Sequence, residues 1–299
     1  MRQAMASNMP QTPEELVACL VLLLNLEHKG GDRFIGRKHP DGTGRVFGGQ
    51  AIAQALGAAR HTVEEGREAH SLHAYFLRPG SDDLPIEFRV KRDLDGRSFS
   101  NRRVVASQDG KPILNLTASF QIPVGGPHHQ APQMPEVPGP EELVPDSDLQ
   151  KQVAKALPEG PLRRLAERPS PIDFRSVEPR DWLKPEVREP VSHVWFRTVA
   201  PLPPEPAVHR AVLAYISDFH LLGTALHPHG KGVFDPTVKA ASLDHALWFH
   251  DSFAVDEWLL YATESPWSGH ARGLARGQIF SRDGRLVASV AQEGMLRHT

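Results

Sequence analysis

The sequence predicts an α+β protein in which two similar units each wrap an antiparallel sheet around one long helix. A helix-like segment followed by four strand-like runs occurs twice along the 299 residues. In each copy an Asp-Gly pair, Asp109-Gly110 or Asp283-Gly284, stands before the last run, and such a pair is a strong hairpin signal. The short matches HSLH at 70–73 and ASLD at 241–244 fall in corresponding parts of the two copies, which indicates an internal repeat.

The first unit follows a short helix whose start is marked by capping residues. Thr12 is a suitable N-cap, Pro13 occupies the first helical position and Glu15 completes a capping box. Residues 46–60 are rich in small apolar side chains, which predicts a tightly packed helix, and the polar, glycine-rich stretch 32–44 is predicted to be a loop. Four strands are expected at 70–77, 85–92, 98–107 and 112–122.

The second unit repeats this order. Apolar residues at helical spacing predict a helix over 208–222. The stretch 123–145 is crowded with Pro and Gly, a short helix is expected at 146–157, and 161–190 is expected to hold loops and an extended piece. Strands are expected at 240–249, 258–264, 271–280 and 286–296. We therefore predict an N-terminal repeat (1–122), a linker (123–160) and a C-terminal repeat (161–299) that carries the candidate catalytic residues. Two such sheets can pair edge to edge, which removes an exposed edge from each.

Composition and charge exclude several classes of protein. The net charge is -2 with 23% charged residues, which is ordinary globular composition and lacks the basic face that nucleic-acid binding requires. The apolar run 16–26 is too short to cross a bilayer, so no membrane insertion is expected. Cys19 is the single cysteine, which rules out an intrachain disulfide and favours a reducing compartment, the cytoplasm. No carboxylate stands at a metal-site spacing from the histidines, so we expect neither a metal nor a cofactor.

Three polar residues stand where buried apolar side chains are expected. Asp218 falls on the apolar stripe of the predicted second helix, where desolvation would raise its pKa and suit it as a general base. Gln292 shares the apolar face of the last strand, and its amide can both donate to and accept from a water molecule. Ser242 lies in the run 240–249 without a G-x-S-x-G elbow, so we interpret it as holding a water rather than as a nucleophile.

Each of these residues alone also fits a structural role. The carboxylate could cap a bend or pair with an arginine or a histidine. The amide could satisfy backbone groups at a strand end, and the hydroxyl could bond to nearby backbone. The sequence by itself leaves these alternatives open.

Long segments of both units resemble type II acyl-CoA thioesterases. In the first unit they are RVFGGQ at 45–50, HSLHAYFLRPG at 70–80, SFSNRR at 98–103 and GKPILNLTASFQ at 110–121. In the second unit they are SDF at 217–219, SLDH at 242–245 with WFH at 248–250, DEWLLY at 256–261, ARG at 271–273 and VAQEG at 290–294. The resemblance implies a double hot-dog fold, in which two helix-wrapped sheets are fused in one chain.

The resemblance also implies an activity and roles for the three polar residues. In that family an Asp, a Thr or Ser, and a Gln from the second half bind the attacking water, and these roles fall on Asp218, Ser242 and Gln292. A bacterial member of that family has Thr where this chain has Ser242. The serine keeps the hydroxyl and lacks the methyl group of the threonine. The implied reaction is hydrolysis of fatty acyl-CoA to a free fatty acid and CoA, with the acyl chain in an apolar tunnel. Association into a homo-oligomer, a dimer or a tetramer, is expected as well.

Substrate contacts are expected from glycine and arginine residues. Gly48 and Gly49 precede a helix without forming a dinucleotide-binding fingerprint, so we expect amides near them to face an oxygen and to stabilise the oxyanion. The arginines that could meet CoA phosphates, or simply cover solvated strand faces, are Arg78, Arg102, Arg103, Arg272 and Arg276. Two other functions stay open: a hydratase that adds water to an enoyl-CoA, and a non-catalytic acyl-CoA-binding protein.

Overall fold

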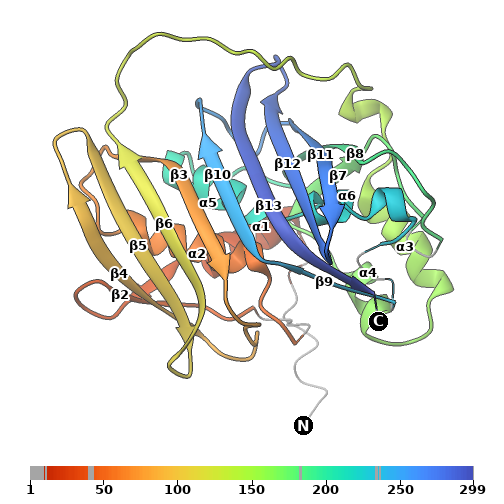
Figure 1. The fold of residues 1–299 in the computed structure, drawn as a ribbon, viewed down its shortest axis with the longest axis horizontal. Helices are drawn as coiled ribbons and strands as arrows, with labels where there is room; N and C mark the ends of the chain where they lie inside the picture. Colours follow the sequence, from red (N-terminus) through yellow and green to blue (C-terminus); the bar gives the residue numbers. More distant parts are fainter. Residues whose placement is uncertain are drawn as a thin grey trace.

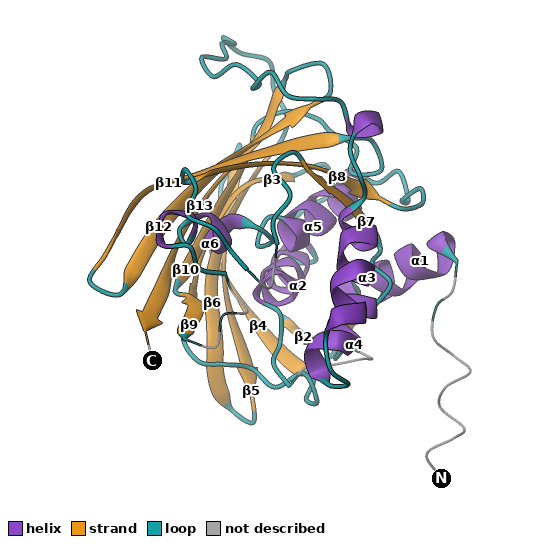
Figure 2. Ribbon diagram, turned by 90° about the vertical axis from the view of Figure 1, so that its right-hand side faces the viewer, coloured by secondary structure: helices purple, strands orange, loops and turns teal. Residues whose placement is uncertain are grey.

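The computed structural model describes Pro10 and residues 12–39, 44–181, 184–232, 235 and 237–298. Within these ranges the strands form one antiparallel sheet in the order β1-β2-β4-β5-β6-β3-β10-β13-β12-β11-β8-β7, with β9 beside β13 (Figure 1). The sheet curves around two central helices, α2 (Gly48–Arg60) and α5 (Pro206–Ile216), which lie on its concave side (Figure 2). This arrangement confirms the predicted α+β architecture of two helix-wrapped sheets.

The strands of the first unit match the four predicted runs. Buried and more exposed residues alternate along β5 and β6, because one face packs on α2 and the other faces outward. Asp109 (φ 48°) and Gly110 (φ 72°) join these two strands, and positive φ at both positions is the geometry of a two-residue hairpin loop. The four strands are β3 (Glu68–Phe76), β4 (Ile86–Asp95), β5 (Phe99–Gln108) and β6 (Lys111–Gln121).

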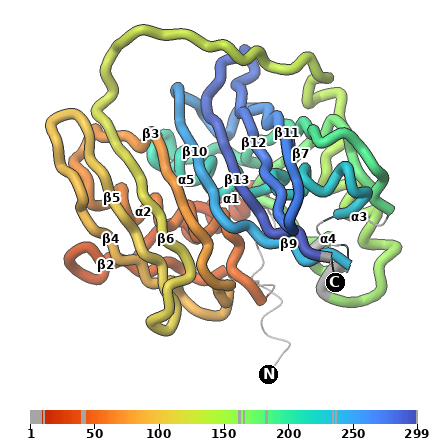
Figure 3. The backbone as a smooth tube through the Cα atoms, viewed as in Figure 1, coloured from red at the N-terminus to blue at the C-terminus, as the bar shows by residue number. Residues whose placement is uncertain are grey.

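The strands of the second unit continue the same sheet. They are β10 (Asp244–Phe249), β11 (Leu259–Gly269), β12 (Arg272–Ser281) and β13 (Leu286–His298). The two units meet where β3 pairs with β10, with Leu72 opposite Leu247. This pairing confirms the predicted edge-to-edge union of the two sheets. The chain after β6 arches over one end of the sheet to reach the second unit (Figure 3). The boundaries 1–122, 123–160 and 161–299 stay a prediction.

Four outer strands extend the sheet at its two ends. They are β1 (Leu26–His28), β2 (Arg33–Gly36), β7 (Ile172–Ser176) and β8 (Val191–Thr198). The loop predicted over 32–44 is therefore wrong at β2, because four residues flanked by glycine and charge carry too little periodicity to mark a strand. The remaining elements are η1 (Pro140–Glu142), α3 (Asp146–Ala156), α4 (Pro161–Glu167), α6 (Leu221–Thr224), η2 (His227–His229) and β9 (Val238–Ser242).

The first helix, α1 (Pro13–Leu24), begins with the predicted capping box. The Thr12 hydroxyl accepts from the Glu15 backbone N–H, and the Glu15 carboxylate accepts from the Thr12 N–H, both at 3.2 Å. The two reciprocal bonds satisfy amides that a helix start otherwise leaves without partners. Of the helices described, none is long and apolar enough to cross a membrane.

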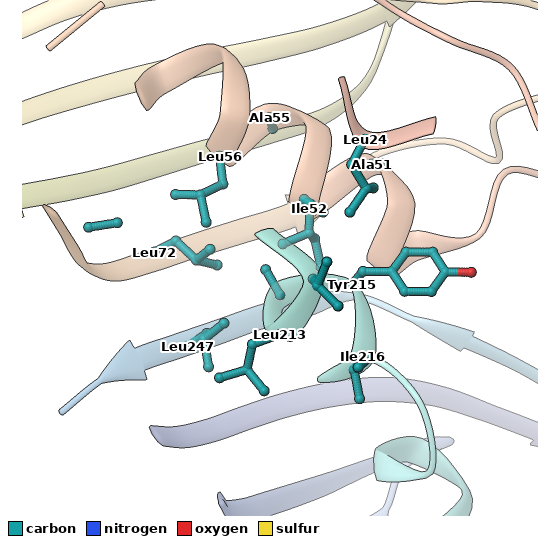
Figure 4. Close-up of a cluster of buried hydrophobic side chains, with 14 of the residues drawn as sticks. Leu24, Ala51, Ile52, Ala55, Leu56, Leu72, Leu213, Tyr215, Ile216 and Leu247 are labelled. Carbon is teal, nitrogen blue, oxygen red and sulfur yellow. The ribbon is translucent and has the colours of Figure 1, made fainter. Parts of the chain in front are cut away.

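The core lies between the two central helices and the junction of the sheets. Ile52 of α2, Leu213 of α5, and Leu72 and Leu247 of the paired strands are all fully buried and point toward one another (Figure 4). A Cβ atom on Gly49 would collide with the backbone carbonyl oxygen of Tyr215. Glycine is thus needed for the start of α2 to approach the end of α5.

Two element boundaries differ from the prediction and determine the site. The helix expected through residue 222 ends at Ile216, and the chain turns before His220, whose φ of 63° cannot continue a right-handed helix. The strand expected over 240–249 is two strands, β9 and β10, separated at Leu243. The Leu243 N–H donates to the Glu293 carbonyl oxygen and its own carbonyl accepts from the Phe76 N–H, both at 2.9 Å. The break lets β9 pair only with the end of β13 while β10 joins the two units.

Candidate active site

Asp218 lies in the turn after α5, at the N-terminus of α2 from the other unit. Its Oδ2 accepts the Gly49 backbone N–H at 2.8 Å. A helix N-terminus presents unpaired amides and a partial positive charge, which stabilise a carboxylate there. A Cβ atom on Gly48 would lie 2.6 Å from the same oxygen, so glycine is needed at this position for the carboxylate to fit.

Gln292 of β13 is the second partner of that carboxylate. Its Nε2 donates to Asp218 Oδ1 at 2.6 Å and to His245 Nδ1 at 3.2 Å, which uses both amide hydrogens. Its Oε1 is buried and has no hydrogen-bond partner among the described residues. A buried acceptor without a partner is costly and is usually satisfied by a bound water or ligand. The site therefore offers one open acceptor directly beside the carboxylate.

His245 completes the network, and it was not among the predicted site residues. Its Nε2 lies 2.9 Å from the Ser217 Oγ, and this hydroxyl donates to the Ala214 carbonyl oxygen at 3.0 Å. Nε2 therefore carries the hydrogen and Nδ1 accepts from Gln292. The alternation of β10 places His245 on the same buried face as Leu247, and that pattern was the available sequence signal.

Burial sets the protonation of the two titratable groups. The pKa of Asp218 is raised to about 6, because burial desolvates the carboxylate more than the hydrogen bonds from Gln292 and Gly49 offset. Burial lowers the pKa of His245 to about 3, so the ring is neutral near pH 7. The 4.0 Å approach of His245 Nδ1 to Asp218 Oδ1 is accordingly not an ion pair. Of these two groups, only Asp218 has a pKa close to the physiological range, which suits a general base.

Ser242 lies at the end of β9, on the same sheet face as Gln292. It is paired with Gly294, two residues beyond Gln292 on β13, and side chains two apart on a strand share a face. A Cβ atom on Gly294 would collide with Leu222, so this face is the concave one that carries α6. Within the described structure the Ser242 hydroxyl makes no hydrogen bond to Asp218 or Gln292. The structure thus brings Asp218 and Gln292 into direct contact and leaves Ser242 beside them.

The predicted role of the two glycines is partly revised. The Gly49 amide, expected near an oxyanion, is engaged by the Asp218 carboxylate. Gly48 supplies the first amide of α2, and this N–H has no acceptor among the described residues. Gly48 therefore leaves room for the Asp218 carboxylate and Gly49 binds it, while the Gly48 amide stays open.

The arginines expected at CoA phosphates fall into different environments. Arg102 is 1% exposed and donates to the Thr62 hydroxyl, to carbonyl oxygens of Thr62, Leu94 and Asn101, and to Asp95. The expectation for Arg102 is wrong, because its donors are used inside the protein. It ties the chain after α2 to the β4–β5 hairpin.

The other arginines lie at the surface. Arg78 donates to the Pro112 carbonyl oxygen, Arg103 pairs with Asp93, Arg276 pairs with Glu264, and Arg272 pairs with Glu293. Their involvement with substrate stays a prediction. No group of three His, Cys, Asp or Glu side chains in the described ranges is arranged to hold a metal ion.

The fold is that of the hot-dog proteins, and comparison with known proteins gives the class, thioester hydrolases, and the family. An acyl-CoA thioesterase family model matches residues 171–295, and a model of the acyl-CoA thioesterase N-terminal domain matches 37–121. Acyl-CoA thioesterase 2 of Haemophilus influenzae is 41% identical over 93% of this chain and 96% of its own length. Human acyl-coenzyme A thioesterase 8 is 39% identical over 96% of both chains. The chain belongs to the acyl-CoA thioesterase family.

Solved structures agree with this assignment. The acyl-CoA thioesterase II TesB2 of Mycobacterium marinum matches with a TM-score of 0.76 and 39% identity, covering 93% of this chain and 97% of that one. The tesB protein MAP1729c of Mycobacterium avium subs paratuberculosis matches with a TM-score of 0.75 and 33% identity, covering 94% and 99%. The chain is therefore similar to these proteins across both units.

Proposed function

We propose that this protein hydrolyses fatty acyl-CoA thioesters to free fatty acid and CoA, with a water activated by Asp218 and held by Gln292 and Ser242. The observation that carries the proposal is the pairing of a buried carboxylate, whose pKa is about 6, with an amide whose Oε1 is an open buried acceptor. A water between these groups donates one hydrogen bond to Asp218 and one to Gln292 Oε1. The Ser242 hydroxyl, on the same sheet face, supplies the third contact.

The chemistry follows from this placement. Asp218 removes a proton from the water as the water oxygen attacks the thioester carbonyl. General base assistance of this kind raises the reaction rate about 10²- to 10⁴-fold. When the tetrahedral intermediate collapses, the carbon–sulfur bond breaks and the proton on Asp218 passes to the leaving thiolate. The products are the acid and the CoA thiol, and the carboxylate is regenerated. The open Gly48 amide at the start of α2 is the candidate oxyanion donor.

His245 acts as a positioning residue in this proposal. If the Gln292 amide turned over, Oε1 would face the Asp218 carboxylate and the lone pair of His245 Nδ1, which are both acceptors. The neutral imidazole, itself held by Ser217, therefore fixes the amide with Nε2 toward these two acceptors and leaves Oε1 free to bind the water. The direction of that one oxygen determines where the water is bound.

Two rival functions use the same fold. A hydratase would add water to an enoyl-CoA without releasing a thiol, and a binding protein would hold acyl-CoA without turnover. Family membership favours hydrolysis over both. Parallel assays of thiol release and of enoyl-CoA hydration on one preparation separate the three functions, and we expect thiol release alone.

The test of the base is Asp218→Asn, which preserves size and removes the proton acceptor. We expect the rate of thiol release from acyl-CoA to fall about 10²- to 10⁴-fold while acyl-CoA still binds. The matched control is Asp82→Asn, because Asp82 is also a buried carboxylate, 4% exposed, that accepts a backbone amide, the Gly44 N–H, at 2.6 Å. Thiol release near the wild-type rate in Asp218→Asn would remove this residue from the mechanism.

The localisation of the enzyme, its assembly and its need for a metal or cofactor stay predictions from the sequence. We infer a cytoplasmic homo-oligomer, a dimer or a tetramer, that uses neither a metal nor a cofactor. Sedimentation of the purified chain distinguishes the two assemblies, and full activity after treatment with a metal chelator is the expected result for metal-free hydrolysis.

A further inference from the structure

A groove of about 390 Å³ lies at the open end of the second unit's sheet. One wall is the tip of the β11–β12 hairpin and another is the loop after α6, and the ends of β9 and β13 form the floor. A hydrogen bond of 2.9 Å between His229 Nε2 and the Ser268 hydroxyl joins the two walls. The lining residues are Leu226, His229, Lys231, Val238, Ser268, Gly269, Ala271, Arg272, Leu296 and Arg297.

The lining has the chemistry of a site for an anion attached to an apolar group. His229, Lys231, Arg272 and Arg297 are basic, and none of the described residues that line the groove is acidic. Lys231 and Arg272 each have one carboxylate partner, at 3.0 and 3.2 Å, in Asp235 and Glu293. Arg297 is exposed and has no ion pair with any other described residue. Leu226, Val238 and Leu296 supply the apolar surface.

The groove is connected to the candidate active site along one strand. Leu296 and Gln292 lie on the same face of β13, four residues apart, which is about 13 Å along an extended strand. Between them stands Gly294, which has no side chain, and Leu222 of α6 packs directly over its backbone. This strip is the direct line along the sheet from the groove to the water site, and the Leu222 side chain covers it.

The hairpin at the groove has a strained tip. Its two-residue turn consists of His270 (φ 49°) and Ala271 (φ 58°), and both positions are left-handed without being glycine. A two-residue hairpin loop requires this conformation, which costs roughly 1–2 kcal/mol per residue when neither residue is glycine. Beside the turn, Trp267 is 42% exposed and has the Arg272 guanidinium 6.0 Å from its ring centre. An exposed aromatic ring next to cations is a common platform for a nucleobase.

We propose that this groove binds the phosphorylated nucleotide end of CoA, with the pantetheine arm passing over Gly294 to bring the thioester to Asp218 and Gln292. This rests on the proposed function. It assigns Arg272, among the exposed arginines singled out from the sequence, to the phosphates, and it adds His229, Lys231 and Arg297. Leu222, which covers Gly294, then has to move aside to admit the arm.

The test compares two thioesters of the same acyl group, one on CoA and one on N-acetylcysteamine, which has no phosphate and no nucleotide. In the double variant Lys231→Ala/Arg297→Ala, we expect KM for acyl-CoA to rise about tenfold or more, because the loss of even one charge-assisted hydrogen bond costs about 1.5–3 kcal/mol. The loss of kcat/KM on acyl-CoA should exceed the loss on the truncated thioester by the same factor. Equal losses on both thioesters, or an unchanged KM for acyl-CoA, overturn the proposal.

A control and a binding measurement complete the design. Arg282→Ala removes an exposed cation at the β12–β13 turn that pairs with Glu141 outside the groove, and we expect its KM to match the wild type. Calorimetric titration with CoA alone measures the groove without any turnover, and the double variant should bind about tenfold or more weakly. If the wild type bound CoA tightly without hydrolysing thioesters, the proposed function would fail while the groove assignment stood. Equal CoA affinity in both proteins would overturn the groove assignment.

Discussion

Gln292 Nε2 donates a 2.6 Å hydrogen bond to Asp218 Oδ1, which joins the last strand of the sheet to the turn after α5. The bond leaves Gln292 Oε1 as a buried acceptor beside a carboxylate whose other oxygen is held by the first unit through Gly49. The candidate site is thus built across both repeats, although its side chains come from the second. Three predictions concern the groups that surround this bond, and a fourth concerns Arg102 in the first unit.

The activity should depend on the ionisation of Asp218. Because burial raises its pKa to about 6, the carboxylate is ionised above that pH and protonated below it. A protonated general base cannot accept a proton, so kcat/KM is expected to be level above pH 7 and to fall about tenfold per unit below pH 6. A pH–rate profile of thiol release measures this. An acid limb near pH 4, the ordinary value for an aspartate, would contradict the assignment.

Removing the positioning imidazole should affect catalysis more than binding. In His245→Phe the Gln292 amide loses one acceptor and is free to turn. We therefore expect kcat to fall about tenfold or more with little change in KM. A net hydrogen bond contributes about 1 kcal/mol, and misdirection of Oε1 adds to that loss. The acid limb should also move above pH 6, because the Gln292 hydrogen bond normally lowers the pKa of Asp218.

A control for that variant lies at the end of the same strand. His250, just after β10, contacts the Ser289 hydroxyl at 2.8 Å and is exposed, so His250→Phe should leave both kcat and the acid limb unchanged. If the two variants behave alike, the effect is structural and the positioning role is refuted.

The glycine at the start of α2 should be required for activity. A methyl group at residue 48 would lie 2.6 Å from Asp218 Oδ2, so Gly48→Ala must displace the carboxylate and reduce kcat about 10²-fold, as misplacements near 1 Å do. Gly57 of the same helix has no neighbouring atom closer than 3.6 Å to such a methyl group. Gly57→Ala should therefore keep full activity and stabilise the fold by about 0.5–1 kcal/mol. Denaturant melts and thiol-release assays on both variants check the contrast.

Arg102 should prove structural. Arg102→Ala leaves the buried Thr62 oxygens and the partly buried carbonyl oxygens of Leu94 and Asn101 without these donors, and we expect the free energy of unfolding to drop by about 3 kcal/mol. The KM for acyl-CoA should stay at the wild-type value in the fraction that folds. A raised KM with unchanged stability would restore the role in phosphate binding that the sequence suggested.

Much of the fold could be predicted because its signals are local. The capping box at Thr12, the Asp-Gly hairpins and the alternation along β5 and β6 depend on residues a few positions apart. The strands that were missed, β1, β2 and β8, are short or lie near the two ends of the sheet, where the pattern is weak, whereas β7 is the extended piece expected within 161–190. The helix expected to run through Asp218 was wrong for a similar reason, because apolar spacing continues past Ile216 although the backbone turns at His220.

The sequence by itself determined that the chain repeats one helix-and-sheet unit, and that Asp218 and Gln292 are polar residues on buried faces. Only the tertiary structure decided their partners: the Gly49 amide, 169 positions away, the imidazole of His245 and the unpaired Oε1. It also decided that Arg102 is buried with its donors used inside the protein, while Arg272 borders a basic groove. Periodicity along a chain reports that a side chain is buried, whereas its partners are set by the packing of elements that are distant in sequence.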